Sequence, residues 1–568
     1  MKRYLFLICF ACLFLFSSCD LLYEMLGGSE TTKTNTNTNT EENFSSMTVE
    51  TDPTGTTYLV KLNASNGIIA NNKTGYARFA SVSEQKNSDS VVQNMRARFD
   101  EGLQKAMQED SARNASAERA IVSGVNNLSY SKNDTAKFYS YTKTETNILG
   151  KEVDVSEQVT STCKYVGKHC YIFADDRNSS SISKGIELSD NDYKLLGQKF
   201  DSCYDLETSI IGNPLYTEYN ETYYVPCNNK IIILVSDLYG DASEDQNGGV
   251  VGYFYQADLY KQEYLNKNKG FFSSSIDSNE CEIFYIDALF LTKQPETVYS
   301  TLVHEFNHMI NYVIKTVNYM TNNTKATYFR TCDAWFTEML SMTTEDMFQN
   351  YLGIKEENSP KGRLPYFNMY YNYGFKLWND SSVPNLIMYA NTYAFGAFLV
   401  RNFGGIALLK ALAQNEYVDE TAITKALQTC NPDFTYLDEK KVEKKIDFDY
   451  AMRKFSMCLF NVAEPTEEML AKTGKDQYFS FYRGTDLNRS DGLKFTPIDI
   501  MNIKCDVEDP DTGKVTNQTI QPAIYNGNES VGLGPEGFSV HYVGKNIDSF
   551  TLYYLPDQQI EYYLVTTN

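Results

Sequence analysis

Two histidines and a glutamate stand at the spacing of a metal-dependent hydrolytic centre. His304, Glu305 and His308 form the pattern His-Glu-x-x-His on a segment that we expect to be helical. Residues four apart on a helix leave the same face, with Cβ atoms about 5–6 Å apart, so both imidazoles can bind one zinc ion. Glu305 can then lean over a water molecule at the metal and take its proton. Only four histidines occur in 568 residues, so finding two of them in this motif argues against chance.

The helix that carries the motif is predicted to be buried. It should run from about Pro295 to Val317, with the proline in its opening turn. Its remaining face is apolar and consists of Leu302, Val303, Phe306, Met309, Ile310, Val313 and Ile314. A buried imidazole and carboxylate cluster without a role would cost several kcal/mol. This favours a metal centre over the alternative of two surface histidines.

A catalytic zinc ion needs a third protein ligand, and no further histidine follows closely. Glu338 lies thirty residues beyond His308, on a second predicted helix near the large apolar side chain of Trp335. It would complete a set of two histidines and one glutamate, with the fourth position open for water. Glu345 is the competing candidate, in a more polar setting.

The motif and its downstream helix resemble those of a known group of enzymes. His-Glu-x-x-His followed by Trp335-x-x-Glu338-x-x-Ser341 is similar to the gluzincin metallopeptidases. Within that group, the sequence His-Glu-Phe-Asn-His-Met-Ile-Asn-Tyr at 304–312 and the strand at 278–287 resemble the hyicolysin family of neutral zinc metallopeptidases. The resemblance covers residues from about 165 to 465.

This resemblance implies zinc as the cofactor, with His304, His308 and Glu338 as ligands and Glu305 as the catalytic carboxylate. It also implies an α+β fold, with a zincin-like catalytic domain made of a small mixed sheet and a helical half. The chain departs from the family pattern on both sides of the third ligand. A threonine precedes this glutamate where asparagine is common, and a methionine follows it where glycine is usual.

The expected activity is hydrolysis of internal peptide bonds in a protein or peptide substrate. The Gly-x-Met-Glu-Asn signature of related aminopeptidases is absent, which favours internal cleavage. The strand at 281–287, just before the motif helix, could pair with an extended substrate backbone. The alternative is a surface-displayed binding protein or adhesin with a vestigial or structural zinc site.

A tetrahedral intermediate needs a second hydrogen-bond donor opposite the metal. Gluzincin aminopeptidases place a catalytic tyrosine just before a helix that ends in glycine. Matching that spacing without a gap to the segment 389–404 selects Tyr389. Tyr393 is the alternative, but it falls one turn into the expected helix, where core packing is the simpler role.

The N-terminus predicts export and a lipid anchor. A basic start, a short apolar run ending at Phe16, and the sequence Ser-Ser-Cys19 fit a signal peptide over residues 1–19. The ending resembles a bacterial lipoprotein box, in which Cys19 becomes the acylated mature N-terminus, although Phe16 stands where Leu, Val or Ile is preferred. We therefore expect a lipid-anchored protein of the bacterial cell envelope, at the outer membrane or cell surface. It would be secreted if Cys19 is not acylated.

Composition divides the rest of the chain into four parts. Residues 20–51 are rich in Thr, Asn, Ser and Glu and are interpreted as a flexible tether. An N-terminal β-rich domain is expected at 52–165, the zinc metallopeptidase domain at 166–470, and a C-terminal β domain at 471–568. The formal net charge of -22 argues against nucleic acid as a partner, since it repels phosphate backbones.

Two further segments have alternative interpretations. Apolar residues recur at helical spacing from Val91 to Met107, which indicates a surface helix on the β-rich domain. A removable propeptide is the alternative for this N-terminal region. The oxygen-rich loop at 237–249 could bind calcium, but the EF-hand order is absent and a solvated turn is the simpler interpretation.

Overall fold

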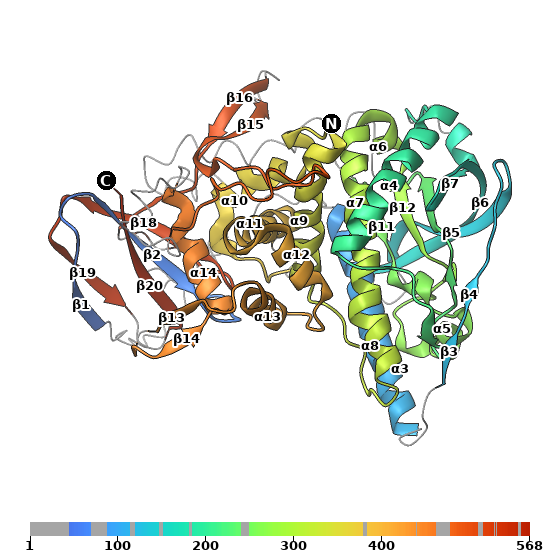
Figure 1. Cartoon of the computed structure of the whole chain (residues 1–568), viewed down its shortest axis with the longest axis horizontal. Helices are drawn as coiled ribbons and strands as arrows, with labels where there is room; N and C mark the ends of the chain where they lie inside the picture. The colour runs from blue at the N-terminus through green and yellow to red at the C-terminus, as the bar shows by residue number, and fades with distance from the viewer. Residues whose placement is uncertain are drawn as a thin grey trace, which may run out of the picture. The chain divides into compact units, whose positions relative to one another are not determined.

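The structure is a computed structural model with mixed helices and strands, consistent with the α+β class (Figure 1). It divides into two compact units, one within residues 1–85, 368–384 and 501–568 and the other within 86–367 and 385–500. The residues that it describes are 45–69, 88–113, 120–146, 152–180, 185–239, 249–378, 383–438, 440–461, 478–508, 515–527, 529, 531–554 and 558–567.

The larger unit contains a six-stranded mixed sheet in the order β11-β12-β10-β7-β6-β5. Strand β10 is parallel to both β7 and β12, whereas β11 is antiparallel to β12 and β5, β6 and β7 form an antiparallel series. Every residue of β7, β10 and β12 is buried, as expected for near-continuous apolar runs in a covered sheet. The strands are β5 (Thr135–Thr146), β6 (Glu152–Val166), β7 (Cys170–Asp175), β10 (Ile231–Ser236), β11 (Gly252–Phe254) and β12 (Ile283–Asp287).

The helices of this unit cover the sheet and form a helical half. They include α3 (Ser88–Arg113), α4 (Asp190–Ile210), α5 (Gln262–Lys267), α6 (Ala288–Lys293), α7 (Pro295–Tyr312), α8 (Asn318–Asn322), α9 (Ala334–Leu352), α11 (Asn385–Phe403), α12 (Gly405–Gln414), α13 (Glu420–Cys430) and α14 (Phe448–Met457). Helix α10 (Leu364–Tyr370) crosses the boundary between the units. Three short strand pairs join β3 (Ile121–Ser123) to β8 (Glu218–Asn220), β4 (Val125–Asn126) to β9 (Cys227–Asn228), and β13 (Thr435–Leu437) to β14 (Glu443–Lys445).

Helix α7, which carries the predicted motif, follows directly from the sheet. Strand β12 ends at Asp287, whose carboxylate caps α6 by accepting hydrogen bonds from the amides of Leu289 and Phe290. Pro295 then opens α7, and a π-helical turn at Val313–Val317 continues it. Because α7 packs against both the sheet and α9, its histidines lie between the strands and the helical half.

The smaller unit is built from strands of both chain ends. Strand β2 (Thr56–Asn63) lies between β18 (Phe538–Lys545) and β20 (Ile560–Thr567) in a sheet completed by β17 (Tyr525–Asn526). Two further pairs join β1 (Ser45–Glu50) to β19 (Ser549–Tyr554) and β15 (Ile503–Glu508) to β16 (Val515–Ile520). The predicted C-terminal strands are present as β18 and β19, and each pairs with an N-terminal strand, β18 with β2 and β19 with β1.

This division differs from the predicted domain boundaries. The region 52–165 does not form a unit of its own, because β2 belongs to the smaller unit whereas α3, β5 and β6 belong to the larger one. The helix predicted at Val91–Met107 is present as α3, but it is not a surface helix of a β-rich domain. Its apolar face is buried in the unit that contains the histidine motif.

Several predictions fall on residues that the structure leaves undescribed. The signal peptide, Cys19 and most of the tether lie within residues 1–44, and most of the oxygen-rich loop lies within 240–248. The end of the predicted tether is not flexible linker, because Ser45–Glu50 form strand β1 and pair with β19. Among the described residues, no helix has the length and apolar character needed to cross a bilayer.

Candidate metal centre

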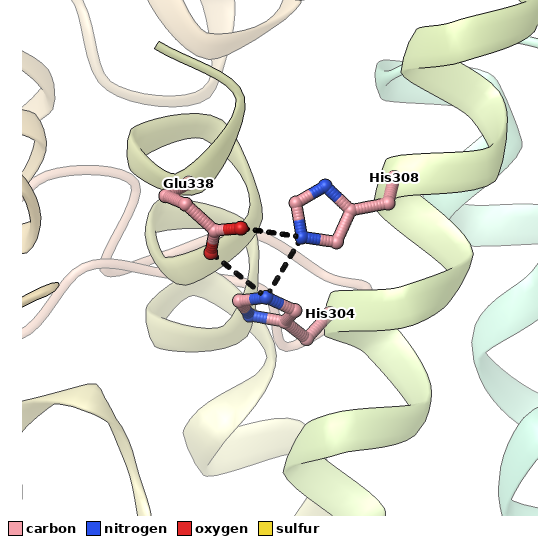
Figure 2. A group of neighbouring side chains, drawn as sticks. All are labelled: His304, His308 and Glu338. Atoms are coloured by element: carbon pink, nitrogen blue, oxygen red, sulfur yellow. Dashed lines mark hydrogen bonds and ion pairs between the residues drawn. The ribbon is translucent and has the colours of Figure 1, made fainter. Parts of the chain in front are cut away.

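Two histidines of α7 and one glutamate of α9 converge on a single point (Figure 2). The Nε2 atoms of His304 and His308 lie 2.9 Å apart. Glu338 faces both rings, with Oε2 3.1 Å from Nε2 of His304 and Oε1 3.1 Å from Nε2 of His308. All three side chains are buried. The structure therefore brings together the three predicted ligands, which lie on two different helices.

The donor atoms of this cluster suit a zinc ion. Zinc takes imidazole nitrogens and carboxylate oxygens at about 2.0–2.2 Å, and catalytic sites use three protein ligands with an open fourth position. Three donors about 3 Å apart around one point are compatible with such bond lengths. Within the described part of the chain, no other group of His, Cys, Asp and Glu side chains has this arrangement.

The outward-facing ring nitrogens are held by other side chains of α9. Nδ1 of His304 lies 2.7 Å from Oε1 of Glu345, whose other oxygen accepts a hydrogen bond from Ser300. Nδ1 of His308 lies 3.0 Å from Oγ1 of Thr337. Such partners fix the orientation of a ligating imidazole and raise its basicity. Glu345, the competing ligand candidate, thus contacts His304 from outside the cluster, and Thr337 has a defined place despite departing from the family pattern.

The charges of the cluster depend on one another. Burial lowers the pKa of His304, but the carboxylates of Glu345 and Glu338 outweigh it and raise that pKa to about 10. Burial lowers the pKa of His308, and the charges of Arg96 and His304 lower it further, so together they outweigh the opposing effect of Glu338. Burial would raise the pKa of Glu338, but the two histidines hold it well below its usual range. A proton on His304 therefore balances the buried carboxylates, and a metal ion that replaced it would release this proton.

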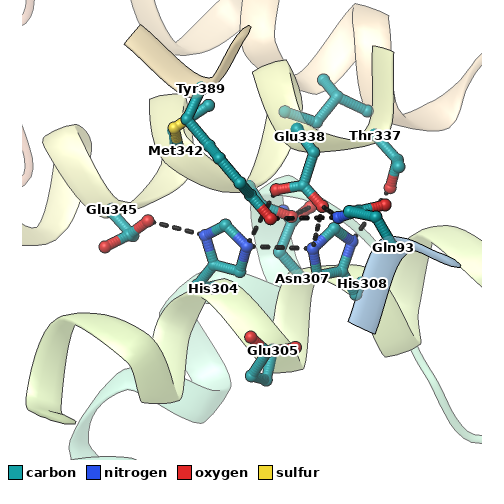
Figure 3. A network of polar contacts seen from close by, with 12 residues as sticks. Gln93, His304, Glu305, Asn307, His308, Thr337, Glu338, Met342, Glu345 and Tyr389 are labelled. Atoms are coloured by element: carbon teal, nitrogen blue, oxygen red, sulfur yellow. Dashed lines mark hydrogen bonds and ion pairs between the residues drawn. The ribbon is translucent and has the colours of Figure 1, made fainter. Parts of the chain in front are cut away.

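Glu305 lies beside the imidazoles on α7 (Figure 3). Its Oε2 atom accepts a hydrogen bond from the backbone amide of Phe254, at a distance of 2.8 Å. Phe254 is the last residue of β11, so the sheet orients this carboxylate directly. Arg96 of α3 donates to the same oxygen over 3.1 Å.

The strand that could receive a substrate is β11. Strand β12 lies between β11 and β10, and both of its edges are hydrogen-bonded to these neighbours. The prediction that residues 281–287 pair with a substrate backbone is therefore wrong, since an interior strand has no unpaired main-chain edge. Strand β11 is at the end of the sheet order and packs against α7.

Tyr389 reaches the cluster, whereas Tyr393 does not. The Tyr389 hydroxyl accepts a hydrogen bond of 3.1 Å from Gln93, which also donates to Oε1 of Glu338 at 2.5 Å (Figure 3). Tyr393 instead donates to Asp346 over 3.0 Å and is fully buried. The expected helix start was misplaced, because α11 begins at Asn385 and Tyr389 lies inside it.

Sequence reasoning missed two residues at this centre, Gln93 and Arg96 of α3. The helical spacing of the segment predicts the helix, but as a surface helix and not as an element at the metal centre. A usable signal was present, because both polar side chains fall among the apolar positions that α3 buries. Nothing in the local sequence, however, shows which part of the fold receives that face.

Comparison with known proteins agrees with this geometry. No protein-family model matches the chain. It is 25% identical over 345 residues to the neutral metalloprotease ShpI of Staphylococcus hyicus, an alignment that covers 59% of this chain and 64% of that protein. The chain is a distant relative of a metallopeptidase. It spans less than two thirds of that relative's length, so the likeness supports the class of enzyme and no finer assignment.

Proposed function

We propose that this protein is a zinc-dependent endopeptidase. The observation that carries the proposal is the convergence of His304, His308 and Glu338 on one point, with Glu305 beside them. The distant likeness to a neutral metalloprotease supports the same class of reaction. When bound, zinc supplies Lewis-acid activation of a water molecule and of the scissile carbonyl group.

The chain's own residues would handle the proton and the developing charge. Glu305 is oriented through Oε2 by the amide of Phe254, and its carboxylate would accept the proton of the attacking water. The same carboxylic acid would then give that proton to the leaving amine. Tyr389 would donate a hydrogen bond to the oxyanion that forms on the scissile carbonyl.

The edge strand β11 is the element best placed to hold a substrate. An extended peptide can add to a sheet edge through main-chain hydrogen bonds, and β11 leads directly to the amide that orients Glu305. Such binding is independent of a free substrate terminus. Together with the missing aminopeptidase signature, this favours cleavage inside a polypeptide.

A direct test measures metal content and cleavage together. The purified chain should bind one zinc ion and cleave denatured casein, a chelator should stop the cleavage, and added zinc should restore it. Because Arg96 contacts Glu305, the assay should include an Arg96→Met variant as well as the wild type. If both bind zinc stoichiometrically and neither cleaves any member of a broad peptide library, the enzyme proposal fails and a binding protein with a structural zinc site is favoured.

Replacing Tyr389 by phenylalanine should lower kcat by roughly 10²–10³-fold, the loss expected for one oxyanion donor. Zinc content should stay unchanged, because the hydroxyl bonds to Gln93 and is not among the ligand atoms. Tyr393→Phe is the matched control. It removes a hydroxyl from the same helix that contacts Asp346, so it should affect stability more than kcat. A wild-type kcat in Tyr389→Phe would place the donor elsewhere.

We also propose that the enzyme is held on the bacterial cell envelope by acyl chains on Cys19. The support is the sequence of the first nineteen residues. The wild type should partition into the detergent phase, and Cys19→Ala should move it to the aqueous phase, since multiple acyl chains anchor firmly. Mass spectrometry that finds an unmodified N-terminus downstream of Cys19 would contradict the anchor.

A further inference from the structure

Helix α3 places two polar side chains directly against the candidate metal centre. The Arg96 guanidinium lies with Nη1 3.3 Å from Oε1 of Glu338 and 3.4 Å from Nε2 of His308. Its Nη2 atom lies 3.1 Å from Oε2 of Glu305. Three nitrogens of one side chain are engaged, because Nε also donates to the carbonyl of Phe254 over 3.1 Å.

Gln93 reinforces this contact from the preceding turn of the same helix. Its amide donates both to Oε1 of Glu338 and to the hydroxyl of Tyr389. Together, Gln93 and Arg96 therefore contact two proposed metal ligands (Glu338 and His308), the proposed base and the proposed oxyanion donor. Arg96 also occupies the carbonyl of Phe254, on the edge strand where a substrate would lie.

These contacts oppose the use of the centre as a metal site. A guanidinium is a permanent cation, and a second cation at the same carboxylate and imidazole would repel it. Oε1 of Glu338 already accepts from Gln93 and faces Arg96, so a metal ion would compete with both for that oxygen.

Helix α3 is held in this position by a well-packed apolar face. The residues that it buries completely or nearly so are Met95, Phe99, Leu103, Ala106 and Met107. The Phe99 ring stacks on Phe272 with ring centroids 5.6 Å apart and meets the edges of Tyr255 and Tyr260. Gln256 donates to the carboxylate of Asp100 over 3.2 Å. The polar contacts at the centre are thus part of a specific docking of the helix.

We infer that α3 is a built-in inhibitor, which competes through Arg96 and Gln93 with the metal ion and the substrate for this centre. The inference rests on the proposed function, and it means that the position of α3 would regulate the peptidase activity. Strand β2, which precedes α3, is hydrogen-bonded between β18 and β20. This part of the chain is built into a sheet, which favours displacement of α3 over its complete removal as a propeptide.

Zinc affinity is the decisive measurement, made by equilibrium competition with a chromophoric chelator at fixed pH. Arg96→Met keeps most of the apolar stem but removes the charge, so it should bind zinc at least about tenfold more tightly than the wild type. Casein hydrolysis per chain should rise by a similar factor. Gln93→Leu removes one competing hydrogen bond and should shift both values in the same direction by a smaller factor, which provides a second route if Arg96→Met does not fold.

Lys105→Met is the matched control, because it also removes a cation from α3. Its ammonium group pairs with Glu101 on the protein surface, with the lysine side chain 53% exposed. It should leave zinc affinity and hydrolysis at wild-type values. Zinc affinity in a folded Arg96→Met or Gln93→Leu protein that equals or falls below that of the wild type overturns the inhibitor.

The two proposals fail in different ways. If zinc binding tightens in Arg96→Met but no variant cleaves peptide bonds, the inhibitor stands as a competitor for metal and the peptidase proposal fails. If the wild type cleaves well and Arg96→Met loses both zinc and activity, the peptidase stands and the inhibitor fails. Arg96 would then be a residue that supports the reaction.

Discussion

Replacing Glu305 by glutamine should leave zinc bound and reduce peptide hydrolysis by about 10⁴-fold, the upper end of what a positioned general base contributes. Glutamine preserves the size of the side chain, and its amide oxygen can still accept the hydrogen bond from Phe254. It cannot accept a proton from water at neutral pH. The substitution therefore removes the proton acceptor and keeps the position of the side chain.

Glu305→Gln should be made both in the wild type and in the Arg96→Met variant. The inhibitor proposal expects Arg96→Met to hydrolyse casein faster, so a large loss of activity can be measured from that parent. Zinc per chain, kcat and the thermal unfolding temperature should be recorded for each pair. Glu357→Gln is a suitable control, because it removes an exposed carboxylate and should leave all three values unchanged. Activity equal to the parent in Glu305→Gln would remove this residue from the mechanism and leave the general base unassigned.

The local part of the metal centre could be predicted from sequence because it needs only helical geometry. His304 and His308 share a helix, so their spacing alone brings the two rings together. Glu338 was accessible as the next carboxylate on a helix with a buried aromatic neighbour. The roles of Glu345 and Thr337 were not accessible, since they depend on how α7 crosses α9.

The contribution of α3 shows why the rest could not be predicted. Arg96 and Glu305 are 209 positions apart, and no local pattern states that one helix docks against the other. The same limit applies to the sheet. Strand β11 has only three residues, yet it forms the edge beside α7, whereas the longer strand β12 lies inside. Sheet order is set by tertiary packing, which a single sequence does not reveal.

Domain boundaries failed for a related reason. Strand β2 was recognised as a strand, but its partners are β18 and β20, near the opposite end of the chain. Strands β5 and β6 fall within the predicted β-rich domain, but they extend the sheet that also contains β7 and β10. Non-local pairing therefore decided the architecture, even where each element had been located correctly.

The two glutamates of α9 should differ in their effect on zinc affinity when each is replaced by glutamine. Glu338 points at both Nε2 atoms, so Glu338→Gln removes a charged ligand and should weaken zinc binding on the order of 10³-fold, one ligand's share of a typical site. Of the two histidines, Glu345 contacts only His304, through its outward-facing Nδ1 atom. Glu345→Gln retains an acceptor for that ring and should weaken binding by about 10–100-fold, as changes in outer partners do.

Both affinities can be measured by the same chelator competition at one pH, with circular dichroism to confirm that each variant is folded. The larger loss of zinc affinity identifies the third ligand. The two variants are closely matched, because both residues lie on one buried helix, seven positions apart, and each substitution removes one negative charge. If Glu345→Gln loses zinc and Glu338→Gln retains it, the third ligand has been misassigned and His304 must turn its other nitrogen to the metal. If neither change alters the zinc affinity, these carboxylates only balance the charge of the histidines, and Glu338 is not a zinc ligand.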